Sequence, residues 1–247
     1  MDALKFFLRG KYAFFKVPDV NTFLYFTYGN IHKPALLGMF GAILGYGGYQ
    51  RQWERNHGGR EKGRGQAVFP EYYEKLKDLS ISIVPSNPKG YWTKKVQTYN
   101  NSVGYASQEK GGNLVVKEQW LEDPEWTIYV KLDSEESCRL AEFICGKKSI
   151  YMPYLGKNDH FADIYDPKCV SVELQEDGGV AINSLTPASA VEFDWMECSH
   201  KYEEYLPIRL DARWNQYEKE AFLLTDALAE SLNSPAYQDG DHTIVFY

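Results

Sequence analysis

The sequence lacks the patterns that mark several common classes of enzyme and metalloprotein. A phosphate-binding P-loop, a Rossmann glycine pattern and a GxSxG nucleophile elbow are all missing. The four cysteines show no CxxC or other zinc-binding spacing, so we expect reduced thiols. Asp159, His160 and Asp163 lie close together in the sequence, but no fourth metal ligand accompanies them. The sequence therefore predicts no metal and no cofactor.

The chain also lacks a hydrophobic run of membrane-spanning length. The apolar stretch from Pro34 to Tyr49 is about 16 residues long, whereas a helix needs ~20 residues to cross a bilayer. The first residues alternate between charged and apolar ones and contain no hydrophobic region of a signal peptide. We expect a cytoplasmic protein that does not bind a membrane.

Positive charge is scarce overall but concentrated early in the chain. The net charge is −7, which at first argues against binding to nucleic acid. Residues 1–117, however, hold 17 Lys and Arg against 8 Asp and Glu, whereas residues 118–247 hold 10 against 26. A basic half can hold phosphates, and an acidic half can face basic neighbours or keep the molecule soluble. The aromatic residues, 15% of the chain and including 19 tyrosines, suit a stacking surface or equally a β-rich core.

The opening segment predicts a strand over residues 5–17 that ends before Pro18. Side chains alternate between the two faces of a regular strand, so one face should be core and the other a basic platform with two aromatic rings. A bulge at Gly10 would change this assignment. The core face would carry Phe6, Leu8, Tyr12 and Phe14, and the platform would carry Lys5, Phe7, Arg9, Lys11 and Phe15.

A buried helix is predicted next, over residues 35–46. Pro34 suits its first turn, and the segment is apolar nearly all round. Gly38, Gly41 and Gly45 lie on roughly one side of it, although each costs about 0.8–1 kcal/mol relative to alanine in a helix interior. We therefore expect another backbone to pack closely against that side.

Basic residues cluster in the end of this helix and in the glycine-rich loop that follows. The loop is too rich in glycine to fold alone and basic enough to attract polyanions, although a solvated connector would have the same composition. The cluster consists of Arg51, Arg55, Arg60, Lys62 and Arg64.

Beyond the loop, the pattern predicts strands over residues 81–84, 126–132 and 169–174. A helix capped by Ser134 should precede the last of them and end at Gly146. With the first strand and the first helix, the order is βαββαβ, which is typical of a ferredoxin-like unit. The RNA-recognition-motif (RRM) fold has the same order and often binds RNA on its open sheet face.

These elements predict an α+β fold with two parts. Residues 1–174 form a ferredoxin-like (RRM-like) domain with an inserted β-hairpin thumb at about residues 91–120. Residues 175–247 form a smaller, acidic, β-rich C-terminal region that ends in a strand over 242–247. Within this region we also expect a helix near residues 217–232.

Several segments together carry a resemblance to a known family. They are residues 7–15 (FLRGKYAFF), the pair Thr27-Tyr28, and residues 33–46 (KPALLGMFGAILGY). This ordered set resembles the N-terminal signature of the CRISPR-associated protein 5 family, which belongs to the repeat-associated RNA-binding proteins. A loop over residues 154–158 (YLGKN) resembles another glycine-containing loop of that family. The resemblance covers roughly the first 50 residues and is patchy beyond them, and the length, hairpin and terminal β segments fit its type I-B branch.

The resemblance implies a subunit of a Cascade surveillance complex, a ribonucleoprotein complex of antiviral defence. Family members cap the 5′ handle of the CRISPR RNA (crRNA) and press the hairpin, as a thumb, against the first backbone subunit and the guide. They also contact the large subunit near the protospacer-adjacent motif. The implied partners are the 5′ handle, a backbone subunit and the large subunit, with target DNA near that motif reached indirectly.

Basic and aromatic residues of the basic half, with one lysine of the 154–158 loop, are the candidates for RNA contacts. Basic residues would hold the phosphates, and aromatic rings are available for stacking. In addition to the basic cluster above, the candidates are Lys5, Arg9, Lys11, Tyr12, Tyr28, His32, Lys33, Tyr91, Trp92, Lys94, Lys95 and Lys157.

Two other interpretations stay open. The type I-C branch of the family cleaves precursor RNA without a metal, which needs a base, an acid and a cation for the phosphate. The candidates here are Tyr28, His32, Lys33 and Tyr46, although His32 and Lys33 could equally contact phosphate only, or His32 could lie at the helix cap. A separate protein performs this processing in type I-B systems, so the resemblance favours a non-catalytic role. The third interpretation is a scaffold without an RNA role, whose acidic half docks a basic neighbour.

Overall fold

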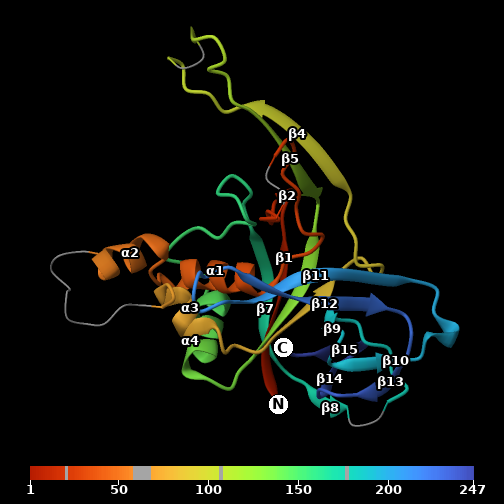
Figure 1. Cartoon of the computed structure of the whole chain (residues 1–247). Coiled ribbons are helices and arrows are strands. Elements are labelled where there is room, and N and C mark those ends of the chain that lie inside the picture. The colour runs from red at the N-terminus through yellow and green to blue at the C-terminus, as the bar shows by residue number, and fades with distance from the viewer. Residues whose placement is uncertain (20–21, 58–67, 106–107, 176–177) are drawn as a thin grey trace.

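The computed structural model describes residues 1–19, 22–57, 68–105, 108–175 and 178–247. A four-stranded sheet lies at its centre, in the order β3-β6-β1-β7, and each strand is antiparallel to its neighbours (Figure 1). Two helices, α1 (Lys33–Leu44) and α4 (Glu135–Cys145), follow β1 and β6 along the chain. The strands are β1 (Asp2–Arg9), β3 (Ile81–Pro85), β6 (Glu125–Lys131) and β7 (Asp163–Ser171).

The chain therefore has the predicted order of strand, helix, two strands, helix and strand, and the class is mixed α and β. Leu4, Phe6 and Leu8 of β1 are fully buried, and they share one hydrophobic core with residues of α1 and α4 such as Phe40 and Leu140. The alternation predicted for the first half of the opening segment is thus confirmed.

Local capping explains where both helices begin. The side chain of His32 accepts a hydrogen bond from the amide of Ala35, and Pro34 follows in the first turn of α1. Ser134 forms a capping box with Ser137 at the start of α4, and Gly146 follows its last residue. The predicted start of α4 is confirmed, whereas α1 begins at Lys33, two residues before the predicted start at residue 35.

The opening segment is not one strand, and this part of the prediction is wrong. β1 ends at Arg9, and β2 (Tyr12–Ala13) belongs to a different sheet. A Cβ atom on Gly10 would lie 2.6 Å from the side chain of Leu155 and 2.9 Å from the backbone oxygen of Phe161. Only glycine lets the backbone pass under that loop, so the alternation of faces stops at Gly10.

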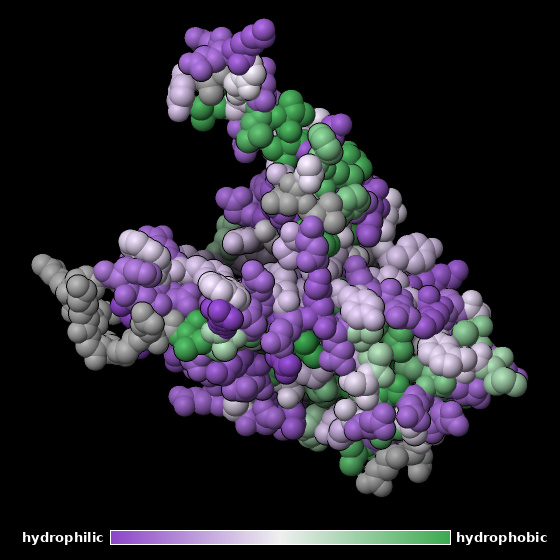
Figure 2. All heavy atoms as spheres, in the orientation of Figure 1, coloured by the Kyte–Doolittle hydropathy of each residue, from purple (hydrophilic) through white to green (hydrophobic). Residues whose placement is uncertain are grey.

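A β-hairpin projects from the body of the molecule (Figure 1). Its arms are β4 (Lys94–Asn100) and β5 (Val115–Glu122), paired from Lys94 opposite Leu121 to Asn100 opposite Val115. β5 also pairs with β2, which joins the hairpin to the body. Its far end is largely hydrophilic, and apolar side chains lie along the ribbon below it (Figure 2).

The C-terminal region consists of short sheets that pack beside the central sheet. The chain enters it after Val172, whose amide donates to the backbone oxygen of Met1. A 3-10 turn, η2 (Trp195–Glu197), lies among its strands. These are β8 (Glu173–Gln175), β9 (Thr186–Pro187), β10 (Val191–Phe193), β11 (Lys201–Leu210), β12 (Tyr217–Thr225), β13 (Ala229–Leu232), β14 (Ala236–Asp239) and β15 (His242–Val245).

The helix expected near residues 217–232 is absent, and strands β12 and β13 occupy this segment. β12 pairs with β11 along its whole length and with β9 on its other edge. Phe222, Leu223 and Leu224 are consecutive and all buried, because both faces of the strand are covered. A strand buried on both faces shows no alternation of polar and apolar residues, so its sequence is easily taken for a helix.

The C-terminal region also covers part of the sheet face that was expected to be open. The Lys5 ammonium pairs with Asp239 of β14 at 2.5 Å, and both side chains are largely buried. The hydroxyl of Tyr129 donates to the same carboxylate at 2.9 Å. Ile244 of β15 packs on Tyr129 and Val84. The expectation of an open basic platform around Lys5 is therefore wrong.

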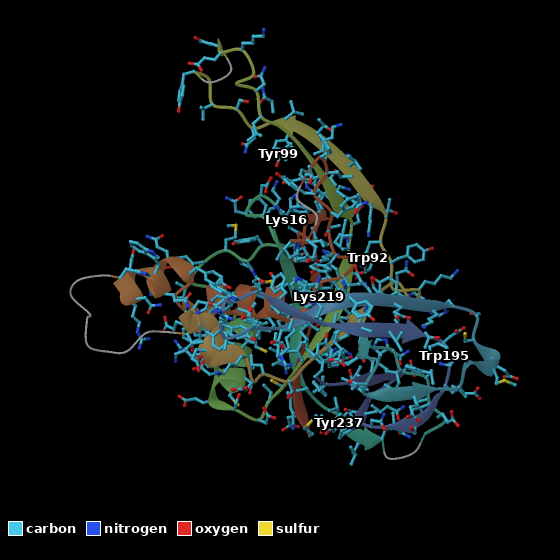
Figure 3. The ribbon with its side chains drawn as sticks, in the orientation of Figure 1. Lys16, Trp92, Tyr99, Trp195, Lys219 and Tyr237 are labelled. Atoms are coloured by element: carbon cyan, nitrogen blue, oxygen red, sulfur yellow. The ribbon has the colours of Figure 1, made fainter. Side chains whose placement is uncertain are left out.

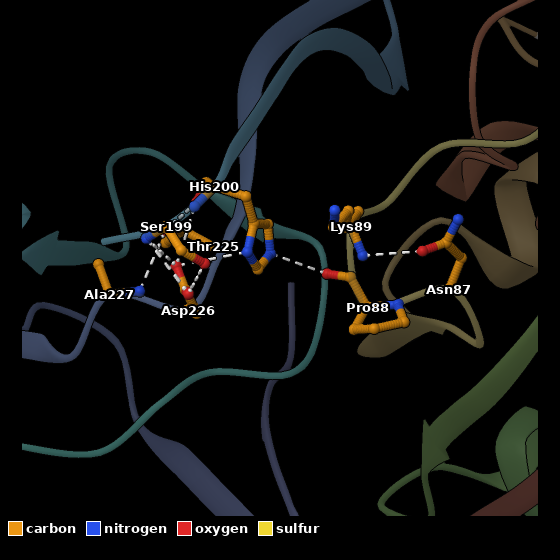
Figure 4. A network of polar contacts seen from close by, with 8 residues as sticks. All are labelled: Asn87, Pro88, Lys89, Ser199, His200, Thr225, Asp226 and Ala227. Atoms are coloured by element: carbon orange, nitrogen blue, oxygen red, sulfur yellow. Dashed lines mark hydrogen bonds and ion pairs between the residues drawn. The ribbon is translucent and has the colours of Figure 1, made fainter. Parts of the chain in front are cut away.

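A polar network ties the C-terminal strands to the segment that leads into the hairpin (Figure 4). The ring of His200 lies between the Asp226 carboxylate, 3.3 Å from Nδ1, and the backbone oxygen of Pro88, 3.0 Å from Nε2. Hydrogen bonds from Ser199, first through its side chain, hold the pKa of Asp226 well below its usual range. The hairpin root is thus anchored to the C-terminal region.

None of the helices among the described residues combines the length and the apolar character that a membrane-spanning helix needs.

Candidate functional site

A groove of about 800 Å³ opens beside helix α1, at the base of the hairpin. Helices α2 (Tyr49–His57) and α3 (Glu71–Leu76) border it, and the loop between α4 and β7 forms another wall. Apolar residues of α1 and of the strand that follows β2 form part of its floor. Its most prominent side chains are six tyrosines from five segments of the chain: Tyr46, Tyr49, Tyr72, Tyr151, Tyr154 and Tyr217.

The glycines of α1 shape this groove. A Cβ atom on Gly41 would lie 2.4 Å from the Cβ atom of Tyr72, so only glycine lets α3 approach so closely. Gly45 ends the helix at φ 80°, and a Cβ atom there would meet Ile150 at 3.0 Å. The prediction that another backbone packs against these glycines is wrong, because the groups that approach Gly41 and Gly45 are the side chains of Tyr72 and Ile150, and Gly38 has no contact closer than 4.0 Å.

A second glycine positions the loop that forms the other wall. Gly156 has a φ of 83°, and a Cβ atom there would lie only 1.9 Å from the backbone oxygen of Phe14. The amide of Phe14 donates to the oxygen of Leu155 at 3.0 Å. The loop therefore lies directly on the strand after β2, and it presents Tyr154 and Lys157 to the groove.

An ion pair fixes the end of the groove nearest the hairpin. The Lys157 ammonium donates to Glu118 at 2.7 Å and to the hydroxyl of Tyr99 at 3.1 Å. Tyr99 belongs to the hairpin arm β4, where Figure 3 labels it. Glu118 also accepts from Tyr99 and from the indole of Trp120. Burial alone would raise the pKa of Glu118, but the hydrogen bonds from Lys157, Trp120 and Tyr99 outweigh it and lower the pKa. Lys157 was predicted to contact RNA, and the structure instead commits its charge to Glu118.

Four of the candidate cations form no ion pair among the described residues, and none of the four is among the residues that line the groove. Arg51 and Arg55 of α2 are exposed, and neither forms an ion pair among the described residues. Lys94 and Lys95 at the root of β4 likewise have no ion pair in that part of the chain, and the Lys95 ammonium lies 5.6 Å from the centre of the Tyr12 ring. Three other predicted RNA contacts, Arg60, Lys62 and Arg64, lie outside the described residues.

The cations of β1 and β2 behave differently. Arg9 pairs with Asp163 at 2.8 Å and lies over the ring of Tyr165, and Lys11 pairs with Asp123 at 3.1 Å. Together with Tyr12 they line a second hollow, of about 680 Å³, on the other side of the loop that carries Gly156. The expected basic platform of Lys5, Arg9 and Lys11 is therefore absent, because each of the three pairs with a carboxylate of the chain.

The four catalytic candidates do not form an accessible acid–base set. His32 is buried among the rings of Phe15, Tyr28 and Tyr217, and burial lowers its pKa to about 3. Tyr28 is buried as well, and desolvation raises its pKa.

The other two candidates are engaged elsewhere. Burial lowers the pKa of Lys33 to about 8, and its ammonium donates to the backbone oxygen of Tyr247 at 3.0 Å. Tyr46 lines the groove, but its hydroxyl donates to Glu136 and accepts from Arg139. Burial and the contact with Glu136 raise the pKa of Tyr46 to about 12. The predicted RNA contacts of Tyr28, His32 and Lys33 are not supported, because Tyr28 and His32 are buried and the half-buried Lys33 donates to the backbone of Tyr247.

Asn30 is a structural residue that the sequence analysis missed. Its amide oxygen accepts from the indoles of Trp92 at 3.1 Å and Trp126 at 2.9 Å, and its amide nitrogen donates to the backbone oxygen of Gly90 at 2.7 Å and to the hydroxyl of Tyr202 at 3.1 Å. This fully buried amide joins the start of α1 to the hairpin root. Trp92 therefore packs inward, whereas Tyr91 remains exposed.

The groove tyrosines were also missed, except Tyr46. The only signal was the abundance of tyrosine, because no spacing in the sequence relates residues from five separate segments. Within the described residues, no group of three or more His, Cys, Asp or Glu side chains is placed to hold a metal ion.

No protein-family model and no curated protein sequence matches the chain. Solved structures do share its fold. A CRISPR protein from Archaeoglobus fulgidus is 13% identical with a TM-score of 0.53, and the match covers 99% of this chain and 98% of that one. A chain of a CRISPR RNA-guided surveillance complex is 13% identical with a TM-score of 0.50 and 92% of each chain covered. A chain of a type III-B Cmr-beta complex bound to cognate target RNA is 11% identical with a TM-score of 0.50, covering 91% of this chain and 85% of that one.

Proposed function

We propose that this chain is a non-catalytic RNA-binding subunit of a CRISPR effector complex, of the CRISPR-associated protein 5 type. The observation that carries the proposal is the groove beside α1, where six tyrosines lie next to helix α2, whose exposed Arg51 and Arg55 form no ion pair among the described residues. Aromatic rings stack on the bases of single strands, and cations beside them hold the phosphates. Such a groove suits a single RNA strand better than a duplex, whose bases are already stacked.

The central sheet supports the same proposal. Its strand order, β3-β6-β1-β7 with antiparallel neighbours, is compatible with a ferredoxin-like domain into which the hairpin is inserted. The printed titles of the three structural matches describe CRISPR proteins, and one of them describes a complex bound to RNA. The N-terminal signature described above agrees with these matches. The fold, the resemblance and the groove thus support the same proposal.

The RNA in the proposal is the 5′ handle of a crRNA, in a type I-B-like Cascade complex. The handle would enter along α2, where Arg51 and Arg55 can reach its phosphates, and place its bases against Tyr151 and Tyr154. The hairpin would act as a thumb that contacts a backbone subunit. The large subunit, and target DNA near the protospacer-adjacent motif, would be neighbours of the chain in the complex.

A binding role is favoured over cleavage by the state of the candidate residues. A general base must reach the 2′-hydroxyl and should have a pKa near the working pH. His32 is buried with a pKa of about 3, and Lys33 and Tyr46 are engaged by other groups.

The direct test is a binding titration of the full chain with a labelled single-stranded RNA and with a duplex of the same sequence, in EDTA. We expect the single strand to bind and to remain uncut, with the duplex at least about tenfold weaker because its bases cannot stack on the tyrosines. Equal affinity for the duplex, or no binding of the single strand, would contradict the proposal. A discrete cut by the wild-type chain that is lost in His32→Asn, which keeps an acceptor at the helix cap, would overturn the non-catalytic role.

A further inference from the structure

Two exposed cysteines face each other where helix α4 packs against β7, the edge strand of the central sheet. Cys145 is the last residue of α4, and Cys169 lies on β7 directly opposite Leu4 of β1. Residues paired across antiparallel strands share a face of the sheet. Leu4 lies in the core beneath the helices, beside Ile144 of α4, so Cys169 points toward the helix side. The thiols of Cys145 and Cys169 lie close enough to interact, and both are free and exposed.

The position of this thiol pair in the chain gives it a consequence for the groove. The segment between the two cysteines is the loop that forms one wall of the groove, with Tyr151, Tyr154 and Lys157. The same segment lines the second hollow with residues 159–163. A covalent bond between Cys145 and Cys169 would join the two ends of this loop to each other.

We propose that Cys145 and Cys169 are a redox-sensitive pair that forms a reversible disulfide by exchange with a small disulfide such as oxidised glutathione. The Cys169 thiolate attacks one sulfur of oxidised glutathione, whose S–S bond breaks, and one glutathione thiolate leaves. The Cys145 thiolate then attacks the Cys169 sulfur of the mixed disulfide and releases the second glutathione. Two protein thiols are oxidised by two electrons, and one glutathione disulfide is reduced to two glutathione molecules. The two protons lost by the cysteines are taken up by the leaving thiolates.

The order of attack follows from the surroundings of the two sulfurs. Burial, and then the neighbouring Cys169 thiol, raise the pKa of Cys145, so its thiol loses its proton less readily than an ordinary cysteine, and we assign it as the resolving thiol. The other two cysteines serve as internal references. Cys138 is exposed on α4 but about two turns before Cys145, and Cys198 lies in the C-terminal region. This inference does not depend on the proposed RNA binding.

The test uses the full chain with Cys138→Ser and Cys198→Ser, which leaves only the proposed pair. The reduced protein is equilibrated with glutathione buffers of increasing oxidation, and thiols and intact mass are measured after acid quenching. We expect both thiols to disappear together, the mass to fall by two hydrogen atoms, and a peptide linking Cys145 to Cys169 to appear in a non-reducing digest. Hydrogen exchange of residues 146–168 should slow in the oxidised form, since the loop ends are joined.

Matched variants distinguish this result from general thiol oxidation. When Cys145→Ser is added to the two-thiol variant, a mixed disulfide between glutathione and Cys169 should form and persist. The wild-type chain should form the same Cys145–Cys169 disulfide as the two-thiol variant. Three outcomes would overturn the proposal: persistence of the mixed disulfide when Cys145 is present, a disulfide between two chains, or a link that involves Cys138 in the wild-type chain.

Discussion

The cations of β1 and β2 and those of α2 and β4 come from the same basic half of the chain, yet their environments are opposite. Lys5, Arg9 and Lys11 each pair with a carboxylate, and those carboxylates lie far along the sequence, at Asp239, Asp163 and Asp123. The cations of the second region, Arg51, Arg55, Lys94 and Lys95, form no ion pair in the described part of the chain. An excess of basic residues therefore does not by itself locate a polyanion site, because folding decides which charges remain available.

The largest effect is expected where a cation is buried. Lys5→Met leaves Asp239 partly buried without its ammonium partner, which should lower the free energy of unfolding by about 2–4 kcal/mol. RNA affinity of the folded protein should not change, since Lys5 does not line the groove. Urea unfolding measures the loss of stability, and an RNA titration measures the affinity. The double variant with Lys5→Met and Asp239→Asn should recover much of the lost stability. Normal stability in the single variant would show that the pair is not structural.

The same pair predicts a pH dependence of stability. Burial acts to raise the pKa of Asp239, but the hydrogen bonds from Lys5 and Tyr129 outweigh it and lower the pKa below the ordinary 3.8. The Asp239 carboxyl therefore binds a proton less tightly in the folded state than in the unfolded state. The stabilisation that its pair with Lys5 contributes is present above the ordinary pKa of 3.8 and is lost as the pH falls below it. Urea midpoints of the wild-type chain measured between neutral pH and pH 3 should fall more steeply than those of Asp239→Asn. Parallel pH curves would contradict this assignment.

Removal of a groove ring should weaken RNA binding without unfolding the protein. Tyr154→Ala should cost about 1–2 kcal/mol of binding, or roughly 5- to 30-fold in affinity, because a stacking surface is lost. Tyr154→Phe keeps the ring and should bind within about twofold of the wild-type chain. Tyr205→Ala, an exposed tyrosine of the C-terminal region, is the matched control. Equal losses in Tyr154→Ala and Tyr205→Ala would show that the groove is not the site.

The two exposed arginines of α2 should have a smaller effect with a distinctive salt dependence. Arg51→Ala with Arg55→Ala should weaken single-stranded RNA binding by about 3- to 10-fold and reduce the slope of log affinity against log salt by about 1.4. Thermal unfolding should not change, since both side chains are exposed. Arg213→Ala, an exposed arginine in the turn between β11 and β12, should leave both affinity and slope unchanged.

The smallest effect is expected for the exposed, paired cations. Arg9→Ala and Lys11→Ala should each change RNA affinity by less than about twofold, because their charges are already compensated by Asp163 and Asp123. A loss at Arg9 or Lys11 larger than that at Arg51 and Arg55 would reverse the comparison between the two regions. It would place the RNA at the second hollow.

The sequence predicted those parts of the fold that depend on neighbouring residues. Ser134 and Pro34 mark helix starts through local hydrogen bonding and backbone geometry, and the order of strands and helices follows from them. The outcome at Gly10 could not be predicted, because the break there depends on a loop more than a hundred residues away. The strand β12 could not be predicted either. Its consecutive residues are buried because other parts of the chain cover both of its faces, and the sequence pattern alone does not distinguish this from a helix.

The candidate site was predicted less well than the fold. The sequence gives the positions of the charged residues but does not indicate which of them form ion pairs. Lys5 and Lys157 were therefore predicted to contact RNA, although each pairs with a carboxylate of the chain. The groove tyrosines come together only in three dimensions. The resemblance to a known family indicated the class of ligand, whereas the location of the site required the coordinates.

The central claim is that RNA lies in the groove beside α1 and not on the β1–β2 side of the molecule. Photo-crosslinking of the full chain to a single-stranded RNA that carries 4-thiouridine, followed by peptide mass mapping, tests it most directly. We expect adducts on the loop with Tyr151 and Tyr154 and on the start of α2 at Tyr49. Adducts concentrated instead on Tyr12, Phe161 and Tyr165, with none in the groove, would contradict it.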